Sequence, residues 1–192
     1  MADNKAKMVK RHQRLAFMNT DETGQEPKFE RMTGFTTLTN SKNPKEYSRQ
    51  YVDRASEDTD VVGYAPATEY SFDRHTNTPV HDRIAKVHDG ELTGDDALVD
   101  ILVVDLFTKT SATEANVPID EGTGDVYAAR KRTYAIIPDS DGDGNDALVY
   151  KGSFKSKSEV ELGFATLDEA EKIAHYTVVN HPIGYPNEED KK

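Results

Sequence analysis

The stretch formed by residues 43–64 constrains the fold most, because neither of its two limbs has an apolar face to bury. The outgoing limb alternates in the manner of a β-strand and places Tyr47, Arg49 and Tyr51 on one side. Residues 53–58 are polar and predict a tip, and the return limb is rich in β-branched and aromatic side chains. We therefore expect a projecting hairpin that contacts something other than its own core.

The charges of this hairpin are divided between its limbs. The outgoing limb is mainly basic, and the tip and return limb are mainly acidic, so one copy can complement another. Such complementarity is what head-to-tail assembly into rings or filaments requires. Aromatic and aliphatic side chains would supply most of the binding energy, and the charges would set register and salt sensitivity. The predicted interface residues are Lys45, Tyr47, Arg49, Tyr51, Arg54, Glu57, Asp58, Asp60 and Val61.

The composition predicts one domain with extended appendages. The 192 residues are 35% hydrophobic and 31% charged, and the mean hydropathy is -0.76. These values are low for a compact monomer and indicate that much of the chain lies in arms, loops and tails. We divide the chain into a basic N-terminal arm (1–14), a single β domain (15–180) and a C-terminal tail (181–192).

The charge balance limits the classes of partner. The formal net charge is -11, and residues 89–146 hold fourteen acidic side chains against four basic ones. This argues against ordinary nucleic-acid binding, which needs a basic face. The absence of cysteine excludes disulfides and cysteine-based chemistry. No apolar run reaches the length of a signal peptide or a membrane span, so we expect a protein made in a cytoplasm without membrane binding.

Most of the remaining chain predicts antiparallel strands. One helix is expected at about 79–88, because Thr78 can cap it, Pro79 suits its first turn, and Val80, Ile84 and Val87 form one stripe. Leu98–Phe107 is the best candidate for a central buried strand. Other strands are expected at 15–18, 29–38, 69–73, 126–137, 147–156, 159–165 and 176–179, with a short second helix at 166–174. The fold class is thus mainly β: an antiparallel β-barrel or sandwich of seven to nine strands, flanked by one α-helix.

The acidic stretch at 138–146 has two interpretations. Asp139, Asp141 and Asp143 occupy alternate positions and are followed by Gly144, as at the start of a calcium-binding loop. The expected closing glutamate is replaced by Tyr150, and the flanking segments predict strands. A tight acidic turn, with Asp and Gly supplying turn geometry, is the alternative.

No stretch predicts catalysis or a bound cofactor. The six histidines, His12, His75, His81, His88, His175 and His181, follow no metal-binding pattern, and we expect them to be exposed. The chain has no phosphate-binding lysine loop, serine elbow or cysteine nucleophile. A hydrolase with a carboxylate pair has no feature that selects the pair. We therefore expect no enzymatic activity; the alternative function is a calcium-dependent β-module that binds a carbohydrate or a cell surface.

Several blocks in order resemble the tail tube (major tail) proteins of tailed bacteriophages of Gram-positive hosts. The blocks are RLAF, RMTGFTTLTNSKNPKEYSRQYVD, TDVVGYAPATEYSFDRHTNTPVHDRI and AARKRTYAIIPDSDGDGNDALVYKGSFKSKSE, with a GDDA–strand–VVDL element before the last. The resemblance covers Leu15 to about Phe164, and SKNPKEYSRQYVD is its most specific part.

This resemblance implies a structural virion protein. It implies hexameric rings, with sheets joined across subunits, that stack into a tube through which DNA leaves the capsid. The implied partners are other copies of the chain, the tape measure protein, and the tail terminator and distal tail proteins, with DNA as passing cargo. The implied location is the virion tail, after assembly in the host cytoplasm. In this family the projecting arm contacts neighbouring subunits and rings, a role that falls on residues 43–64.

Overall fold

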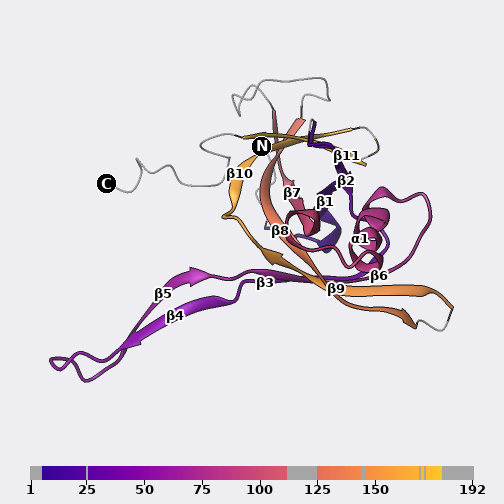
Figure 1. Ribbon diagram of the computed structural model, residues 1–192. Helices are drawn as coiled ribbons and strands as arrows, with labels where there is room; N and C mark the ends of the chain where they lie inside the picture. The colour runs from indigo at the N-terminus through magenta and orange to yellow at the C-terminus, as the bar shows by residue number, and fades with distance from the viewer. Residues whose placement is uncertain are drawn as a thin grey trace. The chain divides into compact units, whose positions relative to one another are not determined.

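A computed structural model describes residues 6–24, 26–111, 125–143, 146–168, 170 and 172–178. These residues form two compact units, whose elements are labelled in Figure 1. The strands are β1 (Arg14–Asn19), β2 (Phe29–Arg31), β3 (Phe35–Ser41), β4 (Pro44–Arg49), β5 (Asp58–Tyr64), β6 (Ala67–Asp73), β7 (Leu98–Ser111), β8 (Asp125–Asp143), β9 (Leu148–Ser156), β10 (Glu161–Leu167) and β11 (Ile173–Val178). The helices are α1 (Pro79–Asp89) and two 3₁₀ turns, η1 (Arg11–Gln13) and η2 (Gly94–Ala97).

The first unit is a closed six-stranded antiparallel barrel. Its strands follow one another in the order β10-β11-β2-β1-β7-β8, and pairing of β10 with β8 closes the ring. It contains the chain up to Met32, residues 100–132 and the chain from Glu159 onward. Closure pairs both edges of the sheet, so this unit has no open edge strand to protect. The predicted mainly β fold with an antiparallel barrel and one α-helix is confirmed.

The barrel core comes from inward-facing residues that alternate along the strands. Phe17 of β1 and Leu102 of β7 are opposite each other in the register and fully buried. The same cluster contains Leu15, Phe29, Val104, Ala129, Ala165, Leu167 and Ala174. The predicted central strand at 98–107 is confirmed and is longer, because β7 continues to Ser111.

A short hairpin replaces the predicted helix at 166–174. Leu167 ends β10 and pairs with Ala174 of β11. Asp168 holds the connection, since its Oδ1 accepts hydrogen bonds from the backbone N–H groups of Lys172 at 2.6 Å and Ile173 at 3.0 Å. The helical spacing of apolar residues was misleading here, because Leu167 and Ala174 face the barrel core from two separate strands, whereas Ala170 is exposed in the connection between them.

The second unit contains residues 33–99 and 133–158. Its sheet has the order β8-β9-β6-β3, with β8 contributing residues 133–143. The predicted single strand at 29–38 is wrong: β2 and β3 are separate, and Gly34 lies between them with φ 76°. A Cβ at Gly34 would come within 3.1 Å of His81 Cε1, so glycine is needed both for the backbone angle and for the close approach.

Helix α1 covers this sheet with the predicted stripe of Val80, Ile84 and Val87, all buried. The expectation that the histidines are exposed is wrong for His81, which is 1% exposed. Its ring packs 4.3 Å from that of Phe72. It lies on the buried side of the helix and has partners for both ring nitrogens, which explains why burial is tolerated.

The other described histidines divide as follows. His12, His75 and His175 are exposed, as expected. His88 is half-buried, and its Nε2 lies 2.7 Å from the hydroxyl of Tyr70. His181 lies outside the described residues.

Strand β8 continues through most of the predicted acidic turn. Ser140 is opposite Lys151, and pairing with β9 extends to Asp143. The register shifts between Pro138 and Ser140. A bulge is where a strand tolerates proline, because the missing N–H costs no ladder bond there. Cross-strand pairing therefore overrides the local turn preference of Asp and Gly.

Candidate assembly interface

The second unit carries the predicted hairpin as a separate two-stranded sheet of β4 and β5. Within this unit the hairpin extends beyond the ends of β3 and β6 (Figure 1). Its base is fixed at Asn43, which adopts φ 43°. Asn43 accepts a hydrogen bond from the N–H of Ala65 at 3.1 Å, and its side-chain amide donates to the carbonyl of Ala65 at 3.2 Å. Asparagine tolerates the left-handed region better than most residues, so this junction suits it.

Both faces of the hairpin are exposed. Every residue of β4 is exposed, and β5 is exposed except at Asp58 and Gly63, which are half-buried. On one face Tyr47 is opposite Asp60. On the other face the hydroxyls of Ser48 and Thr59 form a hydrogen bond of 2.8 Å. The prediction of a projecting hairpin without a buried face is confirmed at the level of structure.

The outgoing strand ends earlier than predicted, at Arg49, so Tyr51 and Val52 lie in the connection to β5 and the predicted tip at 53–58 is too short. The hairpin tip, defined as residues 49–54, combines an apolar projection with two cations. Val52 is fully exposed and Tyr51 is 47% exposed. The guanidinium carbons of Arg49 and Arg54 lie 5.8 and 6.0 Å from the centre of the Tyr51 ring. Cations at this range are attracted to the ring face and limit its motion.

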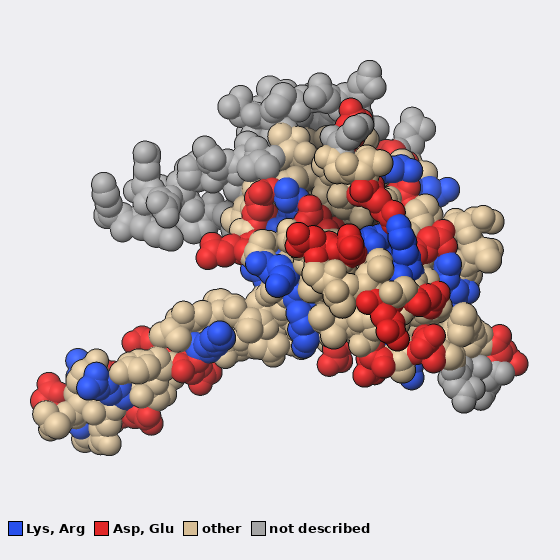
Figure 2. All heavy atoms as spheres, in the orientation of Figure 1, with Lys and Arg blue, Asp and Glu red and all other residues tan. Residues whose placement is uncertain are grey.

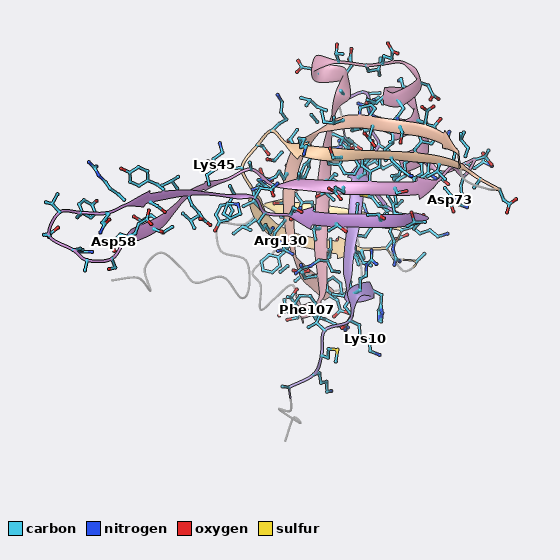
Figure 3. The ribbon with its side chains drawn as sticks, turned by 90° about the horizontal axis from the view of Figure 1, so that it is seen from below. Lys10, Lys45, Asp58, Asp73, Phe107 and Arg130 are labelled. Atoms are coloured by element: carbon cyan, nitrogen blue, oxygen red, sulfur yellow. The ribbon has the colours of Figure 1, made fainter. Side chains whose placement is uncertain are left out.

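The predicted interface residues all fall on this hairpin, and two of them pair within the chain. Arg54 forms an ion pair with Asp58, four residues later. Arg49 is opposite Asp58 in the register, but its guanidinium donates a hydrogen bond to the hydroxyl of Tyr47 at 3.4 Å. Part of the charge that we expected to face a second copy is therefore already balanced inside the hairpin. Figure 3 shows Lys45 near its base and Asp58 toward its tip.

A groove in the second unit was missed by the sequence reasoning. This η2 groove has a volume of about 380 Å³ and is lined by residues 92–95, Ala97, Leu98, 135–138 and Lys157. Arg83 of α1 holds one wall, donating hydrogen bonds to the carbonyls of Asp96 at 2.7 Å and Leu98 at 3.0 Å. The groove brings together segments about forty residues apart, so no local pattern in the sequence could indicate it.

The calcium interpretation of Asp139, Asp141 and Asp143 stays a prediction. Asp139 and Asp141 are exposed residues of β8, and Asp143 is its last residue. Among the described residues, no group of three or more His, Cys, Asp or Glu side chains is placed to hold a metal ion. A calorimetric titration with millimolar calcium tests the prediction, and the absence of heat would remove it.

Asp105, in the acidic segment, is buried and paired within the first unit. It is 5% exposed. Its carboxylate accepts hydrogen bonds from Arg14 at 2.6 and 3.2 Å and from Arg130 at 2.7 Å. The basic residue that ends the predicted N-terminal arm thus pairs within its own chain. Figure 2 shows acidic and basic side chains interspersed along the projecting hairpin.

No helix in the described part of the chain is long and apolar enough to cross a membrane. No protein-family model matches the chain, and no curated protein matches it.

The search of solved structures gives similar chains. One belongs to the tail of an empty GTA particle, refined with helical and C6 symmetry; its TM-score is 0.52 at 13% identity, covering 80% of this chain and 97% of that one. The two chains share a fold. Another belongs to the baseplate of the anti-feeding prophage, refined with six-fold symmetry; its TM-score is 0.45 at 9% identity, covering 82% of this chain and 97% of that one.

Proposed function

We propose that this protein is a structural subunit of a phage tail, which self-assembles into stacked hexameric rings that form the tail tube. The observation that carries the proposal is the hairpin β4–β5, whose two faces are exposed and whose side chains nevertheless include tyrosines and valines. Exposed aromatic and aliphatic residues on a projecting element are typical of a protein interface. The shared fold with a chain of a C6-symmetric tail supports the same function.

The hairpin would contribute to assembly through two kinds of contact. Tyr47, Tyr51 and Val61, each about half exposed, would be the energetic anchors. Lys45 and Asp60 form no ion pair within the described hairpin. These charges would set the register between copies. These contacts need no catalytic residue, and the proposed role is structural.

The net negative charge of the chain suits a channel through which DNA passes. A lumen with net negative charge repels phosphates, so DNA slides without sticking. The net charge of -11 supplies the excess. Asp139 and Asp141 are exposed members of the acidic segment and are candidates for the lumen, whereas Asp105 is paired and buried. The tape measure protein would fill this channel before ejection, and terminator and distal tail proteins would cap the two ends in the virion.

Negative-stain electron microscopy of the purified full chain over a concentration series tests the proposal. We expect six-fold rings at low concentration and stacked rings or tubes at high concentration. Particles that remain single copies throughout, at low and moderate salt, would overturn it.

A further inference from the structure

The η2 groove is a preformed apolar surface with an acidic margin. Seven of its eleven lining residues are apolar, and one, Lys157, is a cation. The apolar ones are Leu92, Ala97, Leu98, Ala135, Ile136, Ile137 and Pro138. Ile137 is 44% exposed although it is a large aliphatic residue in a strand. The hydrogen bonds from Arg83 keep the η2 backbone in place, so a ligand would find the groove already formed.

Besides Lys157, the margin of the groove carries two carboxylates, which are opposite in charge to the cations of the hairpin tip. Asp95 and Asp96 are exposed in the first turn of η2. At the tip, Arg54 already forms an ion pair with Asp58. Among the described residues Arg49 has no carboxylate partner, and it donates a hydrogen bond to Tyr47. Arg49 is therefore the tip cation that remains available for an external carboxylate.

We propose that the tip residues Tyr51 and Val52 of one copy insert into the η2 groove of a second copy, with Arg49 facing Asp95 and Asp96. This inference rests on the proposed function and names the contact by which the hairpin acts. Val52 is fully exposed and provides an apolar side chain that would fill the groove. Arginine beside a rim carboxylate fixes the orientation of the inserted tip.

The occupant is a second copy, because within the described residues the contacts of the tip lie in its own hairpin and leave Val52 exposed. The recorded partners of Tyr51, Arg49 and Arg54 all lie within residues 47–58. A six-residue strand is about 20 Å long, so β4 and β5 carry the tip well beyond the end of the sheet. Tip and groove are different surfaces, and each copy offers one of each. Such a heterologous contact repeats from copy to copy and closes into a ring or extends into a filament.

Two variants that damage opposite sides of the contact test the proposal. Val52→Asp places a charge on the inserted group, and Ile137→Arg places a bulky cation in the groove. Both positions are exposed, so the fold should tolerate the changes, and thermal unfolding checks this. Leu148→Arg is the matched control, because Leu148 is 48% exposed in the same unit and does not line the groove.

Sedimentation velocity measures the size of the species that each variant forms. Each variant alone should remain monomeric at concentrations where the wild type and Leu148→Arg assemble. An equimolar mixture should give species of two chains and none larger, because only one intact tip and one intact groove can meet. Assembly of Ile137→Arg alone beside an assembling wild type would overturn this contact and leave the proposed function standing. Two monomeric variants whose mixture also stays monomeric would show that an intact tip and an intact groove do not meet, and would overturn it as well. A wild type that does not assemble would overturn both.

A charge exchange provides a second test that leaves the apolar residues of the groove lining unchanged. Arg49→Asp should weaken assembly at least tenfold, measured as the concentration of half-assembly. Combining it with Asp95→Arg and Asp96→Arg in the same chain should restore most of the loss, since each copy then carries the reversed pair. An unrestored triple variant that unfolds at the wild-type temperature would contradict the proposed pairing.

Discussion

The barrel and the projecting hairpin use the same element, the antiparallel strand, in opposite ways. In the barrel every strand has two neighbours, and alternate side chains such as Phe17 and Leu102 are fully buried. In the hairpin each strand has one neighbour, and Tyr47 and Val61 remain about half exposed. A barrel side chain is therefore selected by its own fold, whereas a hairpin side chain has to be selected by something outside the chain. This difference predicts that mutations separate into those that affect folding and those that affect assembly.

The largest separation should come from aromatic truncation in the two regions. Phe17→Ala removes a fully buried ring from the barrel and should cost about 3–5 kcal/mol of the free energy of unfolding. Tyr47→Ala, in the hairpin, should change it by less than about 0.5 kcal/mol. Urea denaturation of both variants measures the contrast, and equal losses would show that the hairpin packs against its own chain.

A pair of glycines sharpens the comparison at a smaller scale. A Cβ at Gly163 in β10 would lie 2.4 Å from the carbonyl oxygen of Thr177, whereas a Cβ at Gly63 in β5 would meet nothing within 4 Å. Gly163→Ala should therefore cost about 1–3 kcal/mol through forced backbone shifts. Gly63→Ala should be neutral in the same denaturation assay. A tolerated Gly163→Ala substitution would mean that β10 and β11 are less tightly paired than the structure shows.

Lowering the pH should decrease the free energy of unfolding of the second unit, through His81 of helix α1. Burial lowers the pKa of His81 below its ordinary value, with Arg74 and His75 acting in the same direction and Thr33 and Asp82 opposing them. His81 Nε2 lies 2.8 Å from the carbonyl of Thr33, and Nδ1 accepts from the N–H of His75 at 3.2 Å. A second proton would require Nδ1 to donate where it now accepts, so the folded protein resists protonation.

The sign of the effect follows from proton linkage. The unfolded chain protonates this histidine near pH 6.5, before the folded chain does, so stability falls as the pH decreases below about 6.5. Burial also lowers the pKa of His88, against the opposing influence of Asp89 and Asp141, and adds to the loss. We expect about 1 kcal/mol less stability at pH 5.5 than at pH 7.5, and a smaller difference in His81→Gln. His175→Gln, at an exposed site, is the control and should keep the full difference.

Local patterns predicted those elements whose partners are close in the chain. Helix α1 begins at Pro79 as predicted, because the start signal of a helix and the spacing of its apolar stripe are both local patterns. The hairpin was predicted because strand alternation on both sides of a polar tip is also a local pattern. Strand β8 beyond Pro138 was missed because its partner, β9, decides the conformation of residues that prefer turns.

The functional surfaces show the same division. The hairpin and most of its exposed residues could be named from the sequence, but Val52 was missed, because the outgoing strand was expected to continue past Arg49, where β4 ends. The groove could not, because Leu98 and Ile137 approach each other only after the second unit has folded. His81 was missed for the same reason, since its buried position depends on Thr33, forty-eight residues away.

The most direct test of the account removes the hairpin and keeps its base. Pro44 pairs with Tyr64, so replacing residues 45–63 by an Asn-Gly turn preserves the register, which a deletion of 45–60 would not. Sedimentation velocity and thermal unfolding of this variant are measured beside the wild type. The account predicts a monomer at every concentration, with an unfolding temperature within a few degrees of the wild type. Rings or tubes formed by the shortened chain would contradict it.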